Sequence, residues 1–244
     1  MLISRGNSKL GKLPSFSLPV ITTCPGKTAF CNLFCYGFKG MFILPSVKDV
    51  NERRLDASLK SDFVPIIIKE IQKTRAPAFR LHVIGDFYMP EYIEKWNQIA
   101  TELTEVAFFG STRSWRCDYL IKPLEEFRDL PNVYMKASID ATDFLDPFSC
   151  GWRVWSIEGK GVPCPHDSKM VEDCLACGRC WTHKDTDTSF RLRWGHQVTY
   201  LALAFKERGG INKAMGRSIL SLHKRRKEVN IGTSLHNGKA YLRL

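Results

Sequence analysis

The chain has 244 residues, of which 44% are hydrophobic and 25% charged, and its formal net charge is +11. These values are typical of a globular protein and exclude a disordered, collagen-like or coiled-coil chain. Because no apolar run is long enough to span a membrane and the first residues lack the basic and then apolar order of a secretory signal, we expect a cytoplasmic protein with no membrane partner.

Helices and strands alternate along most of the chain. We predict helices where apolar residues recur at helical spacing, and strands at short runs that are apolar or alternating. The run at 18–22 is expected to open the sheet. Helices are expected at 47–59, 63–74, 91–102, 120–128 and 197–208, and further strands at 79–85, 106–110, 133–138, 154–157 and 190–194.

Strands that alternate with helices are typical of a parallel sheet with right-handed crossovers. About five or six such units are too few for a closed eightfold barrel, which takes ~250 residues. We therefore predict an α/β fold, a partial (β/α) barrel with parallel strands, a cysteine-rich insertion and a basic helical C-terminal segment; a doubly wound open sheet is the alternative. The single domain is expected to comprise the barrel with a three-cysteine site at 1–160, a four-cysteine metal-binding segment at 161–183, and the last strand with basic C-terminal helices at 184–244.

Polar residues follow the predicted strands, at the edge of the sheet where parallel α/β proteins bind ligands. Their charges and hydroxyl groups match a small polar ligand, since an arginine binds a carboxylate in two-pronged fashion. The alternative is that they are N-caps of the following helices, a role that Ser, Thr and Asp favour. The predicted catalytic residues are Asp86, Arg113 and Asp140, and the predicted cofactor-binding residues are Gly85, Asp86, Ser111 and Ser138.

Nine cysteines are present, and clustered thiols in a reducing compartment are more often metal ligands than disulfides. The first cluster consists of Cys24, Cys31 and Cys35, with the spacing Cys-x6-Cys-x3-Cys. Three thiolates are one fewer than usually complete a [4Fe-4S] cluster, so one iron would stay open. The alternatives are a structural zinc completed by a distant residue and three inert buried thiols.

The second cluster contains four cysteines, which close a site. The run Cys-x2-Cys-x2-Cys with a remote Cys-Pro is similar to the ligand run of bacterial ferredoxins in altered order, and we favour iron and sulfide over zinc. The predicted ligands are Cys164, Cys174, Cys177 and Cys180, whereas Cys117 and Cys150 stand apart and are expected to be buried small hydrophobes.

Five segments of the chain together form a recognisable set. They are the stretch Ile3–Lys12, the three-cysteine stretch ending Cys35-Tyr36, the runs His82–Tyr88 and Ser111–Arg116, and the stretch Cys164–Trp181. Together they resemble the phage "gene product eighty-eight" family, over about Ile3 to Trp181. The resemblance implies a phage or prophage origin, and hence the cytoplasm of the host cell.

A weaker similarity is to radical S-adenosylmethionine (radical SAM) enzymes, whose usual spacing Cys-x3-Cys-x2-Cys differs from that of this chain. The similarity implies that Cys24, Cys31 and Cys35 hold the open cluster, with S-adenosyl-L-methionine bound through its amino and carboxyl groups. Gly85 and Asp86 then occupy the strand end that binds the methionyl amino group.

Three functions are compatible with these patterns. The first is a radical-SAM-like iron-sulfur enzyme with two [4Fe-4S] clusters, zinc being the alternative at the four-cysteine site, and with an electron donor as partner. The second is a nucleic-acid-binding protein with structural metal sites, because residues 184–244 hold 13 Lys and Arg against 4 Asp and Glu, densest at 222–227. The third is an electron-transfer module. We favour the first, because it alone uses both the open coordination site and the polar strand ends.

Overall fold

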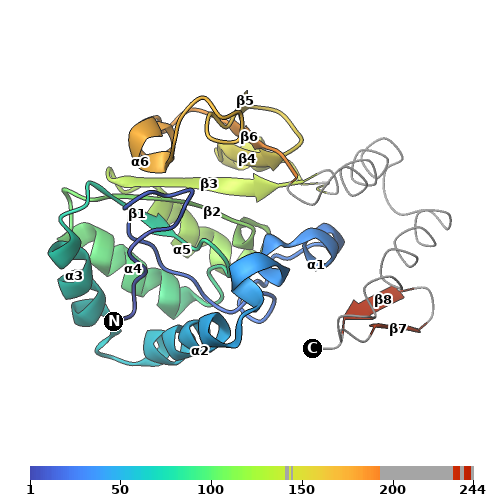
Figure 1. Ribbon diagram of the computed structural model, residues 1–244, viewed down its shortest axis with the longest axis horizontal. Coiled ribbons are helices and arrows are strands. Elements are labelled where there is room, and N and C mark those ends of the chain that lie inside the picture. The colour runs from blue at the N-terminus through green and yellow to red at the C-terminus, as the bar shows by residue number, and fades with distance from the viewer. Residues whose placement is uncertain (141–142, 144, 193–232, 237–238, 243–244) are drawn as a thin grey trace.

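The computed structural model describes residues 1–140, 143, 145–192, 233–236 and 239–242. At its centre is a six-stranded parallel sheet with the strand order β1-β2-β3-β4-β6-β5 (Figure 1). The strands of this sheet are β1 Ala78–Leu81, β2 Ala107–Thr112, β3 Val133–Ile139, β4 Val154–Ile157, β5 Val162–Pro163 and β6 Thr188–Phe190. The α-helices are α1 Ala29–Phe34, α2 Pro45–Leu59, α3 Phe63–Thr74, α4 Pro90–Glu102, α5 Asp118–Arg128 and α6 Cys174–Cys177. Short 3-10 helices are η1 Tyr36–Phe38, η2 Gly40–Ile43, η3 Ser114–Arg116, η4 Pro147–Cys150 and η5 Arg179–Trp181.

The sheet is open and all of its strands run parallel, so the predicted partial (β/α) barrel is confirmed. The helix at 63–74 and the strand at 154–157 have the predicted bounds. The strand expected at 79–85 ends at Leu81, because His82 has a φ of 49° and Gly85 a φ of 78°, and neither is compatible with extended backbone. The strand expected at 106–110 continues to Thr112, so Ser111 lies inside it.

The predictions near the C-terminus have mixed outcomes. The last strand of the sheet by sequence, β6, does not close it at an edge but lies between β4 and β5. The helix expected at 197–208 and the basic run at 222–227 lie outside the described residues. The hairpin of β7, Thr233–His236, and β8, Lys239–Leu242, was not expected. Within the described ranges, no helix combines the length and the apolar character needed to cross a membrane.

An N-terminal segment extends the sheet beyond β1. Ser15 forms a parallel bridge with Arg80, and the Phe16 amide donates to the Arg80 carbonyl at 3.1 Å. The Leu18 amide donates to the Ile84 carbonyl at 3.0 Å. The strand expected at 18–22 is therefore wrong in position: the chain is paired up to Leu18 and turns at 20–23, where Ile21 has a φ of 71°. This turn brings the following residues to the carboxyl edge of the sheet.

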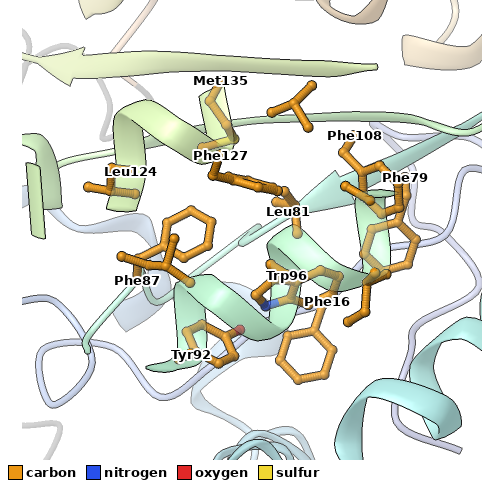
Figure 2. Close-up of a cluster of buried hydrophobic side chains, with 14 of the residues drawn as sticks. Phe16, Phe79, Leu81, Phe87, Tyr92, Trp96, Phe108, Leu124, Phe127 and Met135 are labelled. Carbon is orange, nitrogen blue, oxygen red and sulfur yellow. The ribbon is translucent and has the colours of Figure 1, made fainter. Parts of the chain in front are cut away.

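The face of the sheet covered by α3, α4 and α5, which we call the helix face, holds the main apolar core (Figure 1). Trp96 of α4 is fully buried, and its ring lies 5.5 Å from Phe16, 5.8 Å from Phe63 and 5.7 Å from Phe79, between ring centroids. Figure 2 shows Trp96 near the rings of Phe16, Phe79 and Phe108. Each buried aromatic side chain removes a large apolar area from water, so this face supplies most of the hydrophobic stabilisation.

The opposite face, which we call the concave face, lines a cavity. The Arg80 guanidinium of β1 lies 4.6 Å from the Trp155 ring of β4, although β2 and β3 separate the two strands. Since neighbouring strands lie ~4.8 Å apart, the backbones of these residues are roughly 14 Å apart, and the two long side chains meet over β2 and β3. The cysteine-rich connection between β5 and β6 covers this concave face, and the Cys174 amide donates to the Lys9 carbonyl at 2.8 Å. We call residues 161–183 the four-cysteine cap.

Candidate metal centres

The first candidate site is the three-cysteine loop, residues 24–35, which follows the turn at the carboxyl edge. Thr28 caps α1 by accepting a hydrogen bond from the Cys31 amide at 3.3 Å, and Cys35 ends the helix. One helical turn therefore fixes Cys31 and Cys35 on the same element, while Cys24 lies in the preceding turn. All three thiols are partly exposed.

The three thiols lie within electrostatic reach of one another. Burial, together with the charges of Asp86, Cys35 and Cys31, raises the pKa of Cys24 to about 12. Burial likewise raises the pKa of Cys35 to about 11, which the charge of Arg113 partly opposes. Both thiols are therefore protonated at neutral pH in the metal-free protein, and a metal must displace their protons in order to bind.

Close packing holds the three-cysteine loop against the ends of the strands. A Cβ atom on Gly26 would lie 1.9 Å from the Arg113 carbonyl oxygen, so only glycine fits where the loop meets the end of β2. The Thr28 hydroxyl donates to Asp140 Oδ2 at 3.0 Å and lies 3.6 Å from Cys31 Sγ. The loop is thus in contact with the ends of both β2 and β3.

Asp86 joins the end of β1 to the end of β2. Its buried carboxylate accepts hydrogen bonds from the Thr112 hydroxyl at 2.6 Å, the Arg113 amide at 2.7 Å and the Phe87 amide at 2.8 Å. Burial raises its pKa to about 6, and these hydrogen bonds act in the opposite direction. The neighbouring Gly85 has a left-handed backbone, where a Cβ atom would lie 2.6 Å from Leu18 Cβ. Asp86 therefore holds the carboxyl edge together.

Arg113 forms ion pairs within the protein. Its guanidinium contacts Asp140 at 2.7 Å and Asp143 at 3.2 Å, and Arg116 also pairs with Asp143. A ligand carboxylate would have to compete with Asp140 for Arg113. Arg116, Asp143 and Thr28 were not among the predicted site residues. Arg116 and Asp143 each lie three residues after a predicted site residue, and this shared spacing is the sequence signal that points to them.

The two predicted serines lie apart from this edge. Ser111 and Ser138 line a cavity of about 260 Å³ on the concave face. The structure therefore divides the predicted residues into an edge group beside the three-cysteine loop and a cavity group beneath the four-cysteine cap. The edge group is Gly85, Asp86, Arg113 and Asp140, and the cavity group is Ser111 and Ser138.

The second candidate site is the four-cysteine cap itself, whose four cysteines all line the same cavity. Asp173 caps α6 by accepting from the Ala176 amide at 2.8 Å, and Gly178, with a φ of 69°, reverses the chain toward Cys180. Burial, together with the charges of the other three cysteines, Cys174, Cys164 and Cys177, raises the pKa of Cys180 to about 12.

Neither site is a closed coordination shell in this structure. In the part of the chain that is described, no three His, Cys, Asp or Glu side chains are grouped closely enough to hold a metal ion. The donor set nevertheless fits a thiophilic centre, because each cluster gathers cysteines within electrostatic reach of one another. Of the two remaining cysteines, Cys117 is partly exposed and Cys150 exposed, so the expectation that both are buried is wrong.

The cavity also contains buried N–H groups without an acceptor. Among the described residues, Arg80 Nη1, Trp155 Nε1 and Trp181 Nε1 form no hydrogen bond, and all three residues line the cavity. Buried donors are normally satisfied. The cavity therefore fits a group that carries acceptors.

Comparisons with known proteins relate most of the chain to phage proteins. The model of the family described as Gene product 88 matches residues 1–155. The Gene 88 protein of Mycobacterium phage L5 is 32% identical over 208 residues, which cover 72% of this chain and 85% of that protein. The Gene 88 protein of Mycobacterium phage D29 is 32% identical over 121 residues, 44% of this chain and 50% of that protein. No solved structure gives a significant match.

Proposed function

The chain belongs to the gene product 88 family of phage proteins, and from this premise we propose that it is an iron-sulfur enzyme of the radical SAM-like kind. One observation carries the proposal: the three-cysteine loop and the charged residues Asp86, Arg113 and Asp140 meet at one edge of an open parallel sheet. Ligands bind at that edge in parallel α/β proteins.

In this proposal Cys24, Cys31 and Cys35 hold a [4Fe-4S] cluster and leave one iron for S-adenosylmethionine. When bound, the cluster supplies the electron that cleaves the sulfonium. Burial raises the pKa of the Cys24 and Cys35 thiols, so metal binding there depends on proton release, which the positive charge of Arg113 favours at Cys35.

The charged residues of the edge orient the ligand. Arg113 exchanges its contact with Asp140 for the methionyl carboxylate. The Asp86 carboxylate, which three hydrogen bonds hold at this edge, attracts the ligand ammonium by its charge. The four-cysteine cap keeps water away from the concave face beside this edge.

The four-cysteine cap is proposed to hold a second, fully ligated cluster that is structural or relays electrons from a donor, with zinc as the alternative. The family match ends at residue 155, before the first cysteine of the cap. The second centre is therefore a proposal about this chain, and the proposed setting is the cytoplasm of the host cell.

The test is electron paramagnetic resonance (EPR) of the dithionite-reduced protein with and without S-adenosylmethionine, followed by chromatography for 5′-deoxyadenosine. We expect a spectral change and nucleoside release that are absent in Cys31→Ala and retained in Cys117→Ala, which changes a cysteine outside both clusters. An unchanged spectrum without nucleoside in the iron-loaded wild-type protein would refute the enzyme.

A second candidate function is nucleic-acid binding, which the basic composition of residues 184–244 favours. If Lys224–Lys227 hold phosphates, affinity for duplex DNA falls with salt, and deleting these residues lowers the slope of the log-log plot by ~0.9 for each lost contact. The measurement is fluorescence anisotropy across a salt series. An unchanged slope in the deletion variant would exclude this role for the run.

A further inference from the structure

Arg80 is a buried cation of β1 on the concave face. The residue is 9% exposed, and its guanidinium lies 4.6 Å from the Trp155 ring and 5.7 Å from the Phe109 ring. Nη2 donates to the His82 carbonyl at 3.4 Å, whereas Nη1 has no acceptor. In the described part of the chain, no carboxylate forms an ion pair with it.

This arrangement is costly for a protein without a bound group. Burial lowers the pKa of Arg80, which reports the cost of holding the charge away from water. The indole N–H groups of Trp155 and Trp181 also lack acceptors and line the same cavity. Each buried unsatisfied donor destabilises the fold, and an unpaired charge does so more strongly. Three such groups in one cavity indicate that an anionic acceptor belongs there.

The position of Arg80 identifies the acceptor. Tyr36 is the first group that acts on Arg80, but its phenol is neutral because burial raises its pKa to about 12. The next groups are Cys180 and Cys174, which line the same cavity as Arg80. As metal ligands they are thiolates, and four thiolates outweigh the positive charge of an iron-sulfur core, so that the whole centre is anionic.

We propose that Arg80 is the counter-cation of an anionic iron-sulfur centre held by the four cysteines of the cap, and that Trp155 and Trp181 donate hydrogen bonds to its sulfur atoms. This inference rests on the proposed function, because it requires that the protein carries iron-sulfur clusters. Cys164, Cys174, Cys177 and Cys180 are the ligands.

The proposal gives Arg80 a role in tuning the centre. Reduction adds negative charge, and a buried cation and N–H donors to sulfur stabilise the more negative state. Arg80 therefore raises the reduction potential of the four-cysteine centre, which makes the centre easier for a donor to reduce. Removal of the guanidinium lowers the potential, and removal of one indole N–H lowers it less.

The experiment is an EPR-monitored redox titration in full-length protein that also carries Cys31→Ala, so that the four-cysteine centre gives the signal. We expect Arg80→Met to shift the midpoint to more negative values, Arg80→Lys to shift it less, and Trp155→Phe to give a small shift in the same direction. Arg128→Met is the matched control, since it removes an arginine that lies 4.7 Å from the Trp152 ring on the helix side. Its midpoint should equal that of the parent.

The outcomes separate this inference from the proposed function. Wild-type protein without iron and sulfide would refute the proposed function. An iron-loaded Arg80→Met protein whose midpoint equals that of its parent would overturn the inference and leave the proposed function intact, as would zinc at the four-cysteine site. If Arg80→Met loses the centre, retention in Arg80→Lys supports the counter-cation, and equal loss in a folded Arg80→Lys protein contradicts it.

Discussion

The two faces of the sheet are stabilised in different ways. On the helix face, 26 buried apolar residues of the described chain form one core, whereas the cluster on the concave face has five. The concave face adds cysteines, Arg80 and unsatisfied indole N–H groups to this small core. Hydrophobic burial therefore accounts for the helix face, while in our proposal a bound group completes the concave face.

The largest expected effect is on the helix face. Trp96→Ala leaves a cavity among the surrounding rings and should lower the free energy of unfolding by about 3–5 kcal/mol, with or without metal. Urea unfolding followed by circular dichroism measures this change, with Tyr119→Ala, at a residue 59% exposed, as the control. A loss that depends on the metal content would contradict the separation of the two faces.

The next effect is on the concave face. Cys180→Ser should remove the second centre and leave the N–H donors of the cavity unsatisfied, which costs about 1–3 kcal/mol. Hydrogen exchange should increase across the four-cysteine cap, residues 161–183, and stay unchanged in α4. If exchange in the cap were the same in Cys180→Ser as in the wild type, the cap would be held by its apolar contacts alone.

The next prediction concerns the pH dependence of the free energy of unfolding, which arises from His82 on the helix side of the sheet. Burial, with the charge of Arg80, lowers the pKa of His82 from 6.5 to about 3, and its Nε2 lies 2.8 Å from the Tyr92 hydroxyl oxygen. Below pH 6.5 the histidine binds a proton in the unfolded chain but not in the folded chain. The free energy of unfolding is therefore highest above pH 6.5 and falls as the pH drops toward 3. Between about pH 6.5 and about pH 5 the expected loss is about 2 kcal/mol.

His82→Asn tests this linkage, because asparagine tolerates the φ of 49° at this position and does not titrate. The comparison uses the slope of unfolding free energy against pH, since the substitution also changes the absolute stability. The slope below the ordinary histidine pKa of 6.5 should become smaller in the variant. An unchanged slope would mean that other groups account for the acid sensitivity.

The smallest effect on folding is expected at the carboxyl edge. Cys31 is partly exposed in the short helix α1, so Cys31→Ala should change the free energy of unfolding by less than about 1 kcal/mol while removing the open cluster. Thermal unfolding and iron analysis of the same sample measure both quantities. A large loss of stability would show that the three-cysteine site is structural.

The sequence predicted the elements whose pattern is local. The apolar spacing of α3 and the short apolar run of β4 gave correct bounds, and parallel topology brought Asp86 and Arg113 to one edge as expected. The N-terminal edge segment was misplaced because the apolar run at 18–22 looks like a strand, although Ile21 turns the chain. The two-residue strand β5 is too short to leave a periodic signal.

The role of Arg80 was also missed, although one signal was present. In the run Phe79-Arg80-Leu81 the charged residue alternates with two core residues and must therefore face away from the helices. Its partners, Trp155 and the cysteines of the cap, lie 75 or more residues away in sequence. The ion pairs of Arg113 with Asp140 and Asp143 likewise depend on tertiary structure, because they join the ends of different strands.

The most direct test of the central claim is iron and acid-labile sulfide per chain, measured side by side in anaerobically purified wild-type protein and Cys31→Ala. Two [4Fe-4S] clusters predict about eight iron and eight sulfide per wild-type chain and about half of each in the variant. Colourless wild-type protein that holds zinc without sulfide would contradict the account of both sites.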